Sequence, residues 1–252
     1  FLILIYLYFF QRNLLYHPNE NNYSNDQLFV KVDKVSITTK DEINLLGWFH
    51  QKDIKKFKTL LFFHGNAGKI DNRIYKLNEF SKMNINYLIF GYRGFSGNSG
   101  KPNEEGLYKD AKAAKLWLNN RNISDEQLIL YGESLGTAIA INLAKENKFA
   151  GIILESPFTS MTELAKKYYP YLPVNLILKD KFDSIKKINL IESPILIMHG
   201  KQDKIVPFNM GLKIYNSSNN PKFNYFNDND DHMMEFDKNM INTLKNFIKF
   251  IN

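Results

Sequence analysis

The sequence predicts an α/β fold in which a mostly parallel sheet carries helices on both faces. Short apolar runs such as Thr59–Phe63 are typical of buried parallel strands, and stretches with helical periodicity alternate with them. A chain of 252 residues is long enough to form one large domain with a sizeable core. Ligands bind such sheets at the carboxyl ends of the strands, so we expect the functional residues there.

The N-terminal segment is unusually apolar, because Phe1–Phe10 contains only apolar and aromatic residues. This run is shorter than the roughly 20 residues that a membrane-spanning helix needs. We interpret residues 1–18 as the end of a membrane anchor or signal anchor, with Tyr6, Tyr8 and Arg12 near the interface. A cleaved secretory segment and a core helix are the alternatives. The expected location is a bacterial inner membrane, with the face of the membrane left open.

A polar linker is expected at residues 19–29, followed by the folded domain at residues 30–252. The domain begins with an antiparallel hairpin, Val30–Thr39 and Ile43–His50, whose strands alternate in polarity on either side of a turn. The later predicted strands are Thr59–Phe63, Tyr87–Phe90, the run from Leu128, Gly151–Leu154, Ile195–Met198 and Phe223–Phe226. The predicted helices pass through Tyr75 and Phe80, cover Glu104–Leu118, follow Ser134, and close the chain at Phe236–Ile251.

The most informative stretch runs from Leu128 into a helix rich in small residues and contains Gly132-Glu133-Ser134-Leu135-Gly136. A sharp turn from strand to helix strains the residue at its centre, and flanking glycines allow the turn to close. The Ser134 hydroxyl would then be exposed at a helix N-terminus, where the helix dipole favours developing negative charge. We therefore predict that Ser134 is a nucleophile; a glycine-rich structural turn is the alternative.

A serine nucleophile requires a base, typically a histidine that a carboxylate orients. Of the five histidines, His17 lies beside the linker and His50 ends the hairpin. His64 and His199 follow strands and precede glycines, which favours structural roles. His232 lies in a polar loop after the last strand, from which it can reach back over the sheet, and is the predicted base.

The predicted acid is Asp203, which follows the penultimate strand. The chain order Ser134, Asp203, His232 is the order in which hydrolases with a strand–serine–helix turn carry their triads. The competing carboxylates are Glu155, Asp228, Asp230 and Asp231. The acidic loop has neither the glycine nor the distal glutamate that a calcium loop requires, so we expect no metal there.

An oxyanion needs two N–H donors. The backbone N–H of Leu135, directly after Ser134, is the first candidate. The loop after Phe63 supplies the second, at Asn66 or alternatively at Ala67.

Taken together, these motifs resemble the α/β-hydrolase superfamily, in its branch of membrane-anchored, serine-aminopeptidase-like serine hydrolases. The matching segments are Gln11–Pro18, His64–Gly68, Gly91–Gly97, Gly132–Gly136, Glu155–Ser160 and His199–Asp203. The resemblance covers nearly the whole chain and implies the α/β-hydrolase fold and a triad, without specifying a substrate. The lid is expected at residues 157–190, and the Tyr92–Gly94 loop is expected to brace the nucleophile turn. Asp231 stands where the family usually has glycine before the catalytic histidine.

Composition narrows the functional classes further. The absence of cysteine excludes a thiolate nucleophile, a disulfide framework and a cysteine-ligated metal. The formal net charge of +7 is spread along the chain without a recognition motif, so we expect no nucleic-acid partner. A positively charged chain with an apolar N-terminus is better suited to bind anionic lipid headgroups than nucleic acid.

We expect a serine hydrolase that cleaves carboxylic esters or thioesters by acyl transfer and needs no cofactor. Tyr168–Val174 and Leu176–Leu178 would form an apolar wall over Ser134, which extends the expectation to lipid-like substrates; simple packing is the alternative. The expected partners are a small acyl-bearing substrate and membrane lipid. The competing functions are an aminopeptidase-like serine peptidase and an inactive, membrane-tethered binding module.

Overall fold

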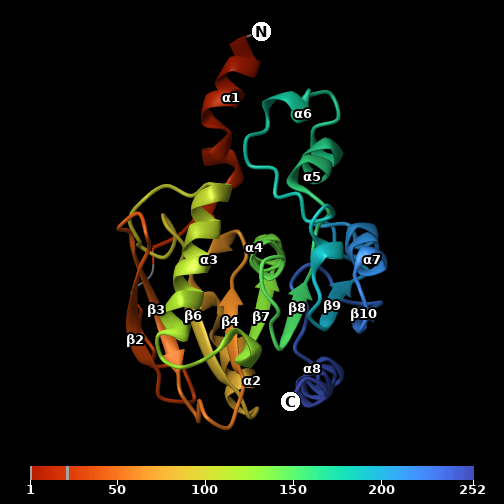
Figure 1. The fold of residues 1–252 in the computed structure, drawn as a ribbon. Coiled ribbons are helices and arrows are strands. Elements are labelled where there is room, and N and C mark those ends of the chain that lie inside the picture. The colour runs from red at the N-terminus through yellow and green to blue at the C-terminus, as the bar shows by residue number, and fades with distance from the viewer. Residues whose placement is uncertain (1, 21–22) are drawn as a thin grey trace.

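The computed structural model describes residues 2–20 and 23–252. Phe1 of the predicted anchor and residues 21–22 of the predicted linker lie outside the described residues. An eight-stranded sheet occupies the centre, and helices flank it on both faces (Figure 1). The predicted mostly parallel sheet with an antiparallel N-terminal hairpin is confirmed.

The order of the strands in the sheet is β10-β9-β8-β7-β4-β6-β3-β2. They are β2 (Asp33–Thr38), β3 (Asn44–His50), β4 (Thr59–Phe63), β6 (Asn86–Phe90), β7 (Leu128–Glu133), β8 (Gly151–Glu155), β9 (Ile195–Gly200) and β10 (Lys222–Asn227). β3 pairs antiparallel with β2 and β6, and the remaining pairs are parallel. The carboxyl ends of β4, β7, β8 and β9 therefore meet at one edge, which carries the predicted site.

The α-helices are α1 (Leu2–Leu15), α2 (Ile74–Ser81), α3 (Glu104–Asn119), α4 (Leu135–Ala144), α5 (Met161–Tyr168), α6 (Val174–Ile177), α7 (Phe208–Ser217) and α8 (Lys238–Phe250). Short 3-10 turns lie at Ile70–Arg73, Asp125–Gln127 and Ile188–Leu190. The sequence did not predict α7, which contains asparagine and glycine, both poor helix formers. Gly211 on α7 lies against His199, because a Cβ there would stand 2.1 Å from the ring Nδ1.

The core lies on both faces of the sheet. Leu61 and Phe63 of β4 join one apolar cluster, with side chains of α3, α4 and α7. Leu60 and Phe62 join the other, with side chains of α2 and α8. Because both faces are covered, every residue of β4 is buried, which explains its uninterrupted apolar sequence.

The N-terminal segment is attached to the loop that follows β4. The two-residue strand β1 (His17–Pro18) pairs in parallel with β5 (Ala67–Gly68), a contact too short to show in the sequence pattern. The end of α1 therefore lies beside the predicted oxyanion loop. Within residues 2–20 and 23–252, no helix combines the length and apolar content required to cross a membrane, and α1 has 14 residues.

Candidate active site

Ser134 lies in a strained turn between β7 and α4. Its backbone has φ 50° and ψ −111°, a conformation that side chains other than glycine rarely adopt. The flanking glycines make room for the turn: a Cβ on Gly136 would stand 2.0 Å from the Phe63 carbonyl oxygen, and one on Gly132 2.6 Å from the Gly136 oxygen. The turn thus packs α4 directly against the ends of β4 and β7, with Ser134 at the apex.

The structure brings the predicted nucleophile, base and acid together. The His232 Nε2 lies 3.1 Å from the Ser134 Oγ, and its Nδ1 lies 2.7 Å from the Asp203 Oδ2. An ionised carboxylate only accepts hydrogen bonds, so we assign the ring proton to Nδ1. The unprotonated Nε2 then faces the serine hydroxyl, as a general base must.

Asp203 is held as a carboxylate. Its Oδ1 accepts the backbone N–H groups of Ile205 and Val206, each at 2.8 Å. Burial raises the pKa of the Asp203 carboxyl, but hydrogen bonds from His199 and His232 outweigh it and hold that pKa well below its ordinary value. The acid is therefore ionised at neutral pH and can stabilise a protonated His232.

His199 contributes more to the site than the sequence indicated. Its Nε2 lies 2.9 Å from the Val206 carbonyl oxygen and 3.2 Å from the Asp203 Oδ2. Since a carbonyl can only accept, Nε2 must carry the proton. His199 thus helps to fix the rotamer of Asp203. The four-residue spacing from His199 to Asp203 was the available signal, but it does not by itself show that the ring turns toward the carboxylate.

Three of the four competing carboxylates have other partners, and Asp230 has a buried Oδ2 that accepts no hydrogen bond from the described residues. Glu155 binds Lys76 beneath the site, Asp228 pairs with Lys201 at 2.5 Å, and Asp231 accepts the backbone N–H of Met233. His232 reaches Ser134 and Asp203 although Asp231 replaces the usual glycine. These contacts leave Asp203 as the acid that the geometry supports.

The predicted oxyanion loop is held from three directions. The Tyr92 hydroxyl donates to the His64 carbonyl at 3.0 Å, and the Arg73 Nη1 donates to the Ala67 carbonyl at 2.9 Å. The Asn66 side chain donates to the Leu15 carbonyl, at the end of α1, at 2.5 Å. The Tyr92 side chain therefore braces the oxyanion loop through His64. The expectation from the sequence was that the Tyr92–Gly94 loop would brace the nucleophile turn.

The close approach of Gly136 to Phe63 and His64 brings the start of α4 next to the oxyanion loop. Leu135 is the first residue of α4, so its N–H has no partner within the helix. The assignment of the Leu135 and Asn66 N–H groups as oxyanion donors stays a prediction that this placement supports.

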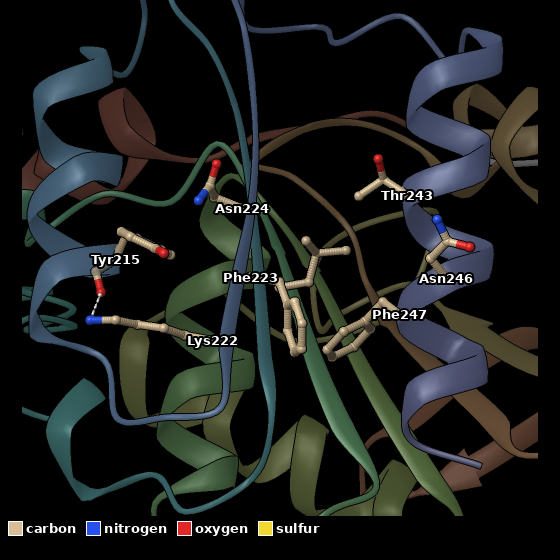
Figure 2. A pocket seen from close by; sticks show the side chains of 8 residues that line it. Tyr215, Lys222, Phe223, Asn224, Thr243, Asn246 and Phe247 are labelled. Atoms are coloured by element: carbon tan, nitrogen blue, oxygen red, sulfur yellow. Dashed lines mark hydrogen bonds between the residues drawn. The ribbon is translucent and has the colours of Figure 1, made fainter.

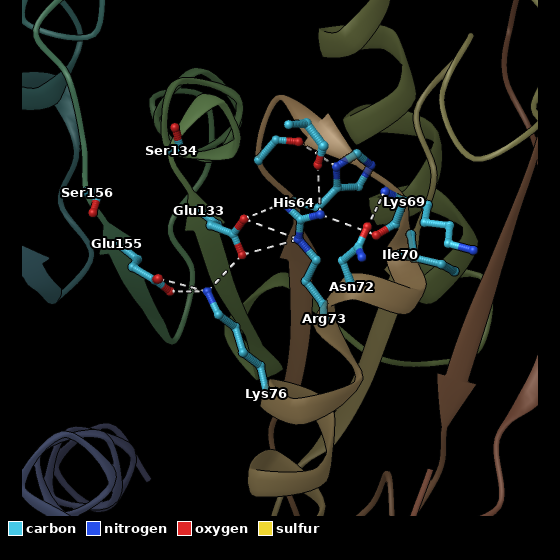
Figure 3. A network of polar contacts seen from close by, with 12 residues as sticks. His64, Lys69, Ile70, Asn72, Arg73, Lys76, Glu133, Ser134, Glu155 and Ser156 are labelled. Atoms are coloured by element: carbon cyan, nitrogen blue, oxygen red, sulfur yellow. Dashed lines mark hydrogen bonds and ion pairs between the residues drawn. The ribbon is translucent and has the colours of Figure 1, made fainter. Parts of the chain in front are cut away.

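A buried charge network lies beneath the nucleophile turn (Figure 3). The Lys76 Nζ, with no exposed surface, lies 2.8 Å from Glu133 and 2.7 Å from Glu155. Arg73 approaches Glu133 to 2.5 Å, and the Tyr131 hydroxyl donates to Glu155. Two cations thus balance two carboxylates, as burial of charge requires.

The network joins the strand ends that carry the site. Glu133 precedes Ser134, and the Glu155 carbonyl accepts the Ser134 N–H at 2.9 Å. Burial lowers the pKa of Lys76, but the two carboxylates outweigh it and raise that pKa. Burial raises the pKa of Glu133, but Lys76 and Arg73 outweigh it and lower that pKa. No pattern in the sequence indicates this network, because a lysine in a short helix normally faces solvent.

A cavity of about 380 Å³ lies elsewhere, between α7, β10 and α8 (Figure 2). Its lining includes Tyr215, Lys222, Phe223 and Phe247 and none of the candidate triad residues. We therefore do not assign it to the chemistry at Ser134.

Lys76→Met should destabilise the fold by about 3–5 kcal/mol, because two buried carboxylates then share only Arg73. One carboxyl group would keep a proton in the folded state that it loses on unfolding, so stability should fall as the pH rises. Urea unfolding at several pH values measures both effects.

The matched control is Lys76→Met with Glu155→Gln, which restores the balance of charge. This double variant should lose the added pH dependence. A Lys76→Met protein with wild-type stability at every pH would contradict the account of the network.

Comparison with known proteins places the chain in a family. The model of the prolyl oligopeptidase family matches residues 80–252, more than half of the chain. Among curated proteins, the chain is 33% identical over 223 residues to "Uncharacterized protein Rv2307c" of Mycobacterium tuberculosis (strain ATCC 25618 / H37Rv), covering 87% of this chain and 79% of that protein. It is 39% identical over 171 residues to human "Alpha/beta hydrolase domain-containing protein 17B", covering 65% of this chain and 56% of that protein.

Solved structures share the fold. The Pyrococcus furiosus esterase Pf2001 superposes with a TM-score of 0.76 at 20% identity, covering 94% of this chain and 98% of that one. The esterase EaEST from Exiguobacterium antarcticum superposes with a TM-score of 0.68 at 15% identity, covering 86% of this chain and all of that one. By its fold and the family model together, this chain is an α/β-hydrolase-fold protein that belongs to the prolyl oligopeptidase family.

Proposed function

We propose that the protein is a serine hydrolase that cleaves carboxylic esters or thioesters by acyl transfer. The observation that carries the proposal is the hydrogen-bonded series from Ser134 through His232 to Asp203, at 3.1 and 2.7 Å. Two proteins of similar fold, Pf2001 and EaEST, are esterases, which supports an ester substrate.

In the proposed mechanism, His232 Nε2 takes the Ser134 proton as Oγ attacks the substrate carbonyl. The N–H groups of Leu135 and Asn66 bind the resulting oxyanion. The tetrahedral intermediate collapses to an acyl-serine, and the leaving alcohol or thiol departs with the proton from His232. Water, deprotonated by His232, then attacks the acyl-serine, and the acid is released as Ser134 regains its proton. Asp203 stabilises the imidazolium in both halves of the reaction.

The competing function is that of a peptidase, which the name of the prolyl oligopeptidase family suggests. An aminopeptidase needs free carboxylates to bind the substrate's terminal amine. Glu133 and Glu155, which lie beneath the nucleophile turn, are only 5% and 1% exposed and are neutralised by Lys76 and Arg73. They are therefore unsuited to that role. An inactive binding module is disfavoured by the complete hydrogen-bonded series at Ser134.

We also propose that the N-terminal segment tethers the protein to a membrane, as in the anchored branch that the sequence resembles. Exposed Tyr6, Phe9 and Leu14 on α1 support this proposal, because exposed apolar side chains gathered on one helix favour lipid over water.

The full chain should pellet with membranes and resist a high-salt wash, since salt does not screen apolar insertion. Release by salt alone would contradict the tether.

Ser134→Ala and His232→Ala should each lower kcat by about 10,000-fold without loss of the fold. Asp203→Asn should have a comparable effect, because an amide can hold the wrong tautomer of His232. Steady-state hydrolysis of a p-nitrophenyl ester measures the losses, and circular dichroism checks the fold. Asp231→Asn, a neighbouring change outside the series, serves as the control. An Asp203→Asn enzyme with most of its activity would refute the assignment of the acid.

Short-to-medium acyl esters or thioesters should be hydrolysed faster than aminoacyl amides. One physical reason is the apolar character of the lid. The other is that Glu133 and Glu155 are neutralised by Lys76 and Arg73 and so cannot bind a substrate amine. Comparing kcat/KM on p-nitrophenyl acyl esters and aminoacyl arylamides tests the preference. Cleavage of the arylamides with no turnover of the esters would establish the peptidase function instead.

A further inference from the structure

Exposed apolar side chains from two distant segments gather at one end of the molecule. Figure 1 shows α1 and α6 side by side beyond the edge of the sheet that carries Ser134. Tyr6, Phe9 and Leu14 are exposed on α1, and Tyr169, Tyr171 and Leu176 are exposed on the lid. Tyr171 is 98% and Leu176 is 83% accessible. Single exposed apolar residues are ordinary, but a group of this extent indicates a binding surface.

Hydrogen bonds join the two segments into one unit. Arg12 of α1 binds Asp180 through two nitrogens at 2.8 and 2.9 Å, and the Tyr16 hydroxyl donates to the same carboxylate at 3.0 Å. The Gln11 amide donates to the Ile177 carbonyl and accepts the Lys179 N–H, both at 2.8 Å. Residues 177–180 of the lid are therefore held against α1 at a fixed position.

The charge of these segments has one sign at the surface. Residues 2–15 and 166–181 contain Arg12, Lys166, Lys167, Lys179 and Lys181 as cations. Asp180 is their sole carboxylate, and its side chain is only 4% exposed beneath Arg12. Tyrosines and lysines around an apolar face are typical of elements that lie in a membrane interface.

The same surface borders the active site on two sides. The Tyr168 hydroxyl donates to the carbonyls of Lys204 and Ile205, at 2.6 and 2.7 Å, in the loop that follows Asp203. On the other side, Asn66 of the predicted oxyanion loop donates to the Leu15 carbonyl. Ile205, two residues after Asp203, adds one exposed apolar side chain to the loop that Tyr168 contacts.

We propose that residues 2–15 and 166–181 form one docking surface for an anionic lipid bilayer, and that the substrate's acyl chain reaches Ser134 from that bilayer. The substrate class rests on the proposed hydrolase function, whereas docking does not. Lipid is favoured over a second copy of the chain, because two copies would bring like charges together. The bilayer would supply negative charge to the lysines of this surface, since Asp180 already pairs with Arg12, and an apolar volume for its exposed side chains.

The test uses the full chain with Ser134→Ala, so that binding is measured without turnover. The probes are vesicles of phosphatidylcholine with and without phosphatidylglycerol, and sedimentation measures the partition coefficient. We expect Tyr171→Ser with Leu176→Ser to lower partitioning about tenfold on both compositions, through lost apolar burial. Lys166→Glu with Lys167→Glu should lower it only on vesicles that contain phosphatidylglycerol.

The matched control is Leu116→Ser with Leu190→Ser, which removes two exposed leucines outside the docking surface and should partition like the parent chain. Thermal melting checks that every variant is folded. Lid variants that partition like the parent would overturn the proposal. So would a parent chain that is a dimer through this apolar surface and becomes monomeric in the lid variants. Failure of the wild-type chain to hydrolyse a soluble ester would instead refute the proposed function, and the binding result would stand separately.

Discussion

The site depends on the close packing of α4 against the ends of β4 and β7. Gly136 lies so near the Phe63 carbonyl that a methyl group there would stand 2.0 Å from its oxygen. This contact accompanies the positive φ of Ser134, which places its hydroxyl at a helix N-terminus, and it brings Leu135 beside the loop of Asn66. One packing constraint thus places the proposed nucleophile and the proposed oxyanion donors together.

Charge neutralisation supports that packing from below. Glu133 and Glu155 end the neighbouring strands β7 and β8, and without Lys76 and Arg73 their buried charges would repel each other under the turn. Arg73 also holds the Ala67 carbonyl, so the same cation connects the nucleophile strand to the oxyanion loop. From above, α1 holds that loop through Leu15 and the lid through Arg12. The N-terminal segment is therefore part of the frame around the site as well as a proposed tether.

The sequence predicted the sheet well because buried parallel strands leave uninterrupted apolar runs, as at Thr59–Phe63. It also predicted which residues would meet, since Ser134, Asp203 and His232 each follow a strand at the same edge. It missed the network around Lys76, because a buried cation is recognisable only once its partners from other strands are known. It also missed the contact of His199 with Asp203 and the ion pair of Arg12 with Asp180, since both depend on tertiary packing and leave no local pattern.

The central claim is that Ser134 carries the acyl group during turnover. The most direct measurement is peptide mapping by mass spectrometry after the enzyme is mixed with a slowly hydrolysed acyl ester and quenched with acid during the first turnover. The account predicts a mass increase equal to the acyl group on the peptide that contains Ser134, which disappears as the substrate is exhausted. Turnover with no acylated serine, or with the acyl group on another residue, would contradict it.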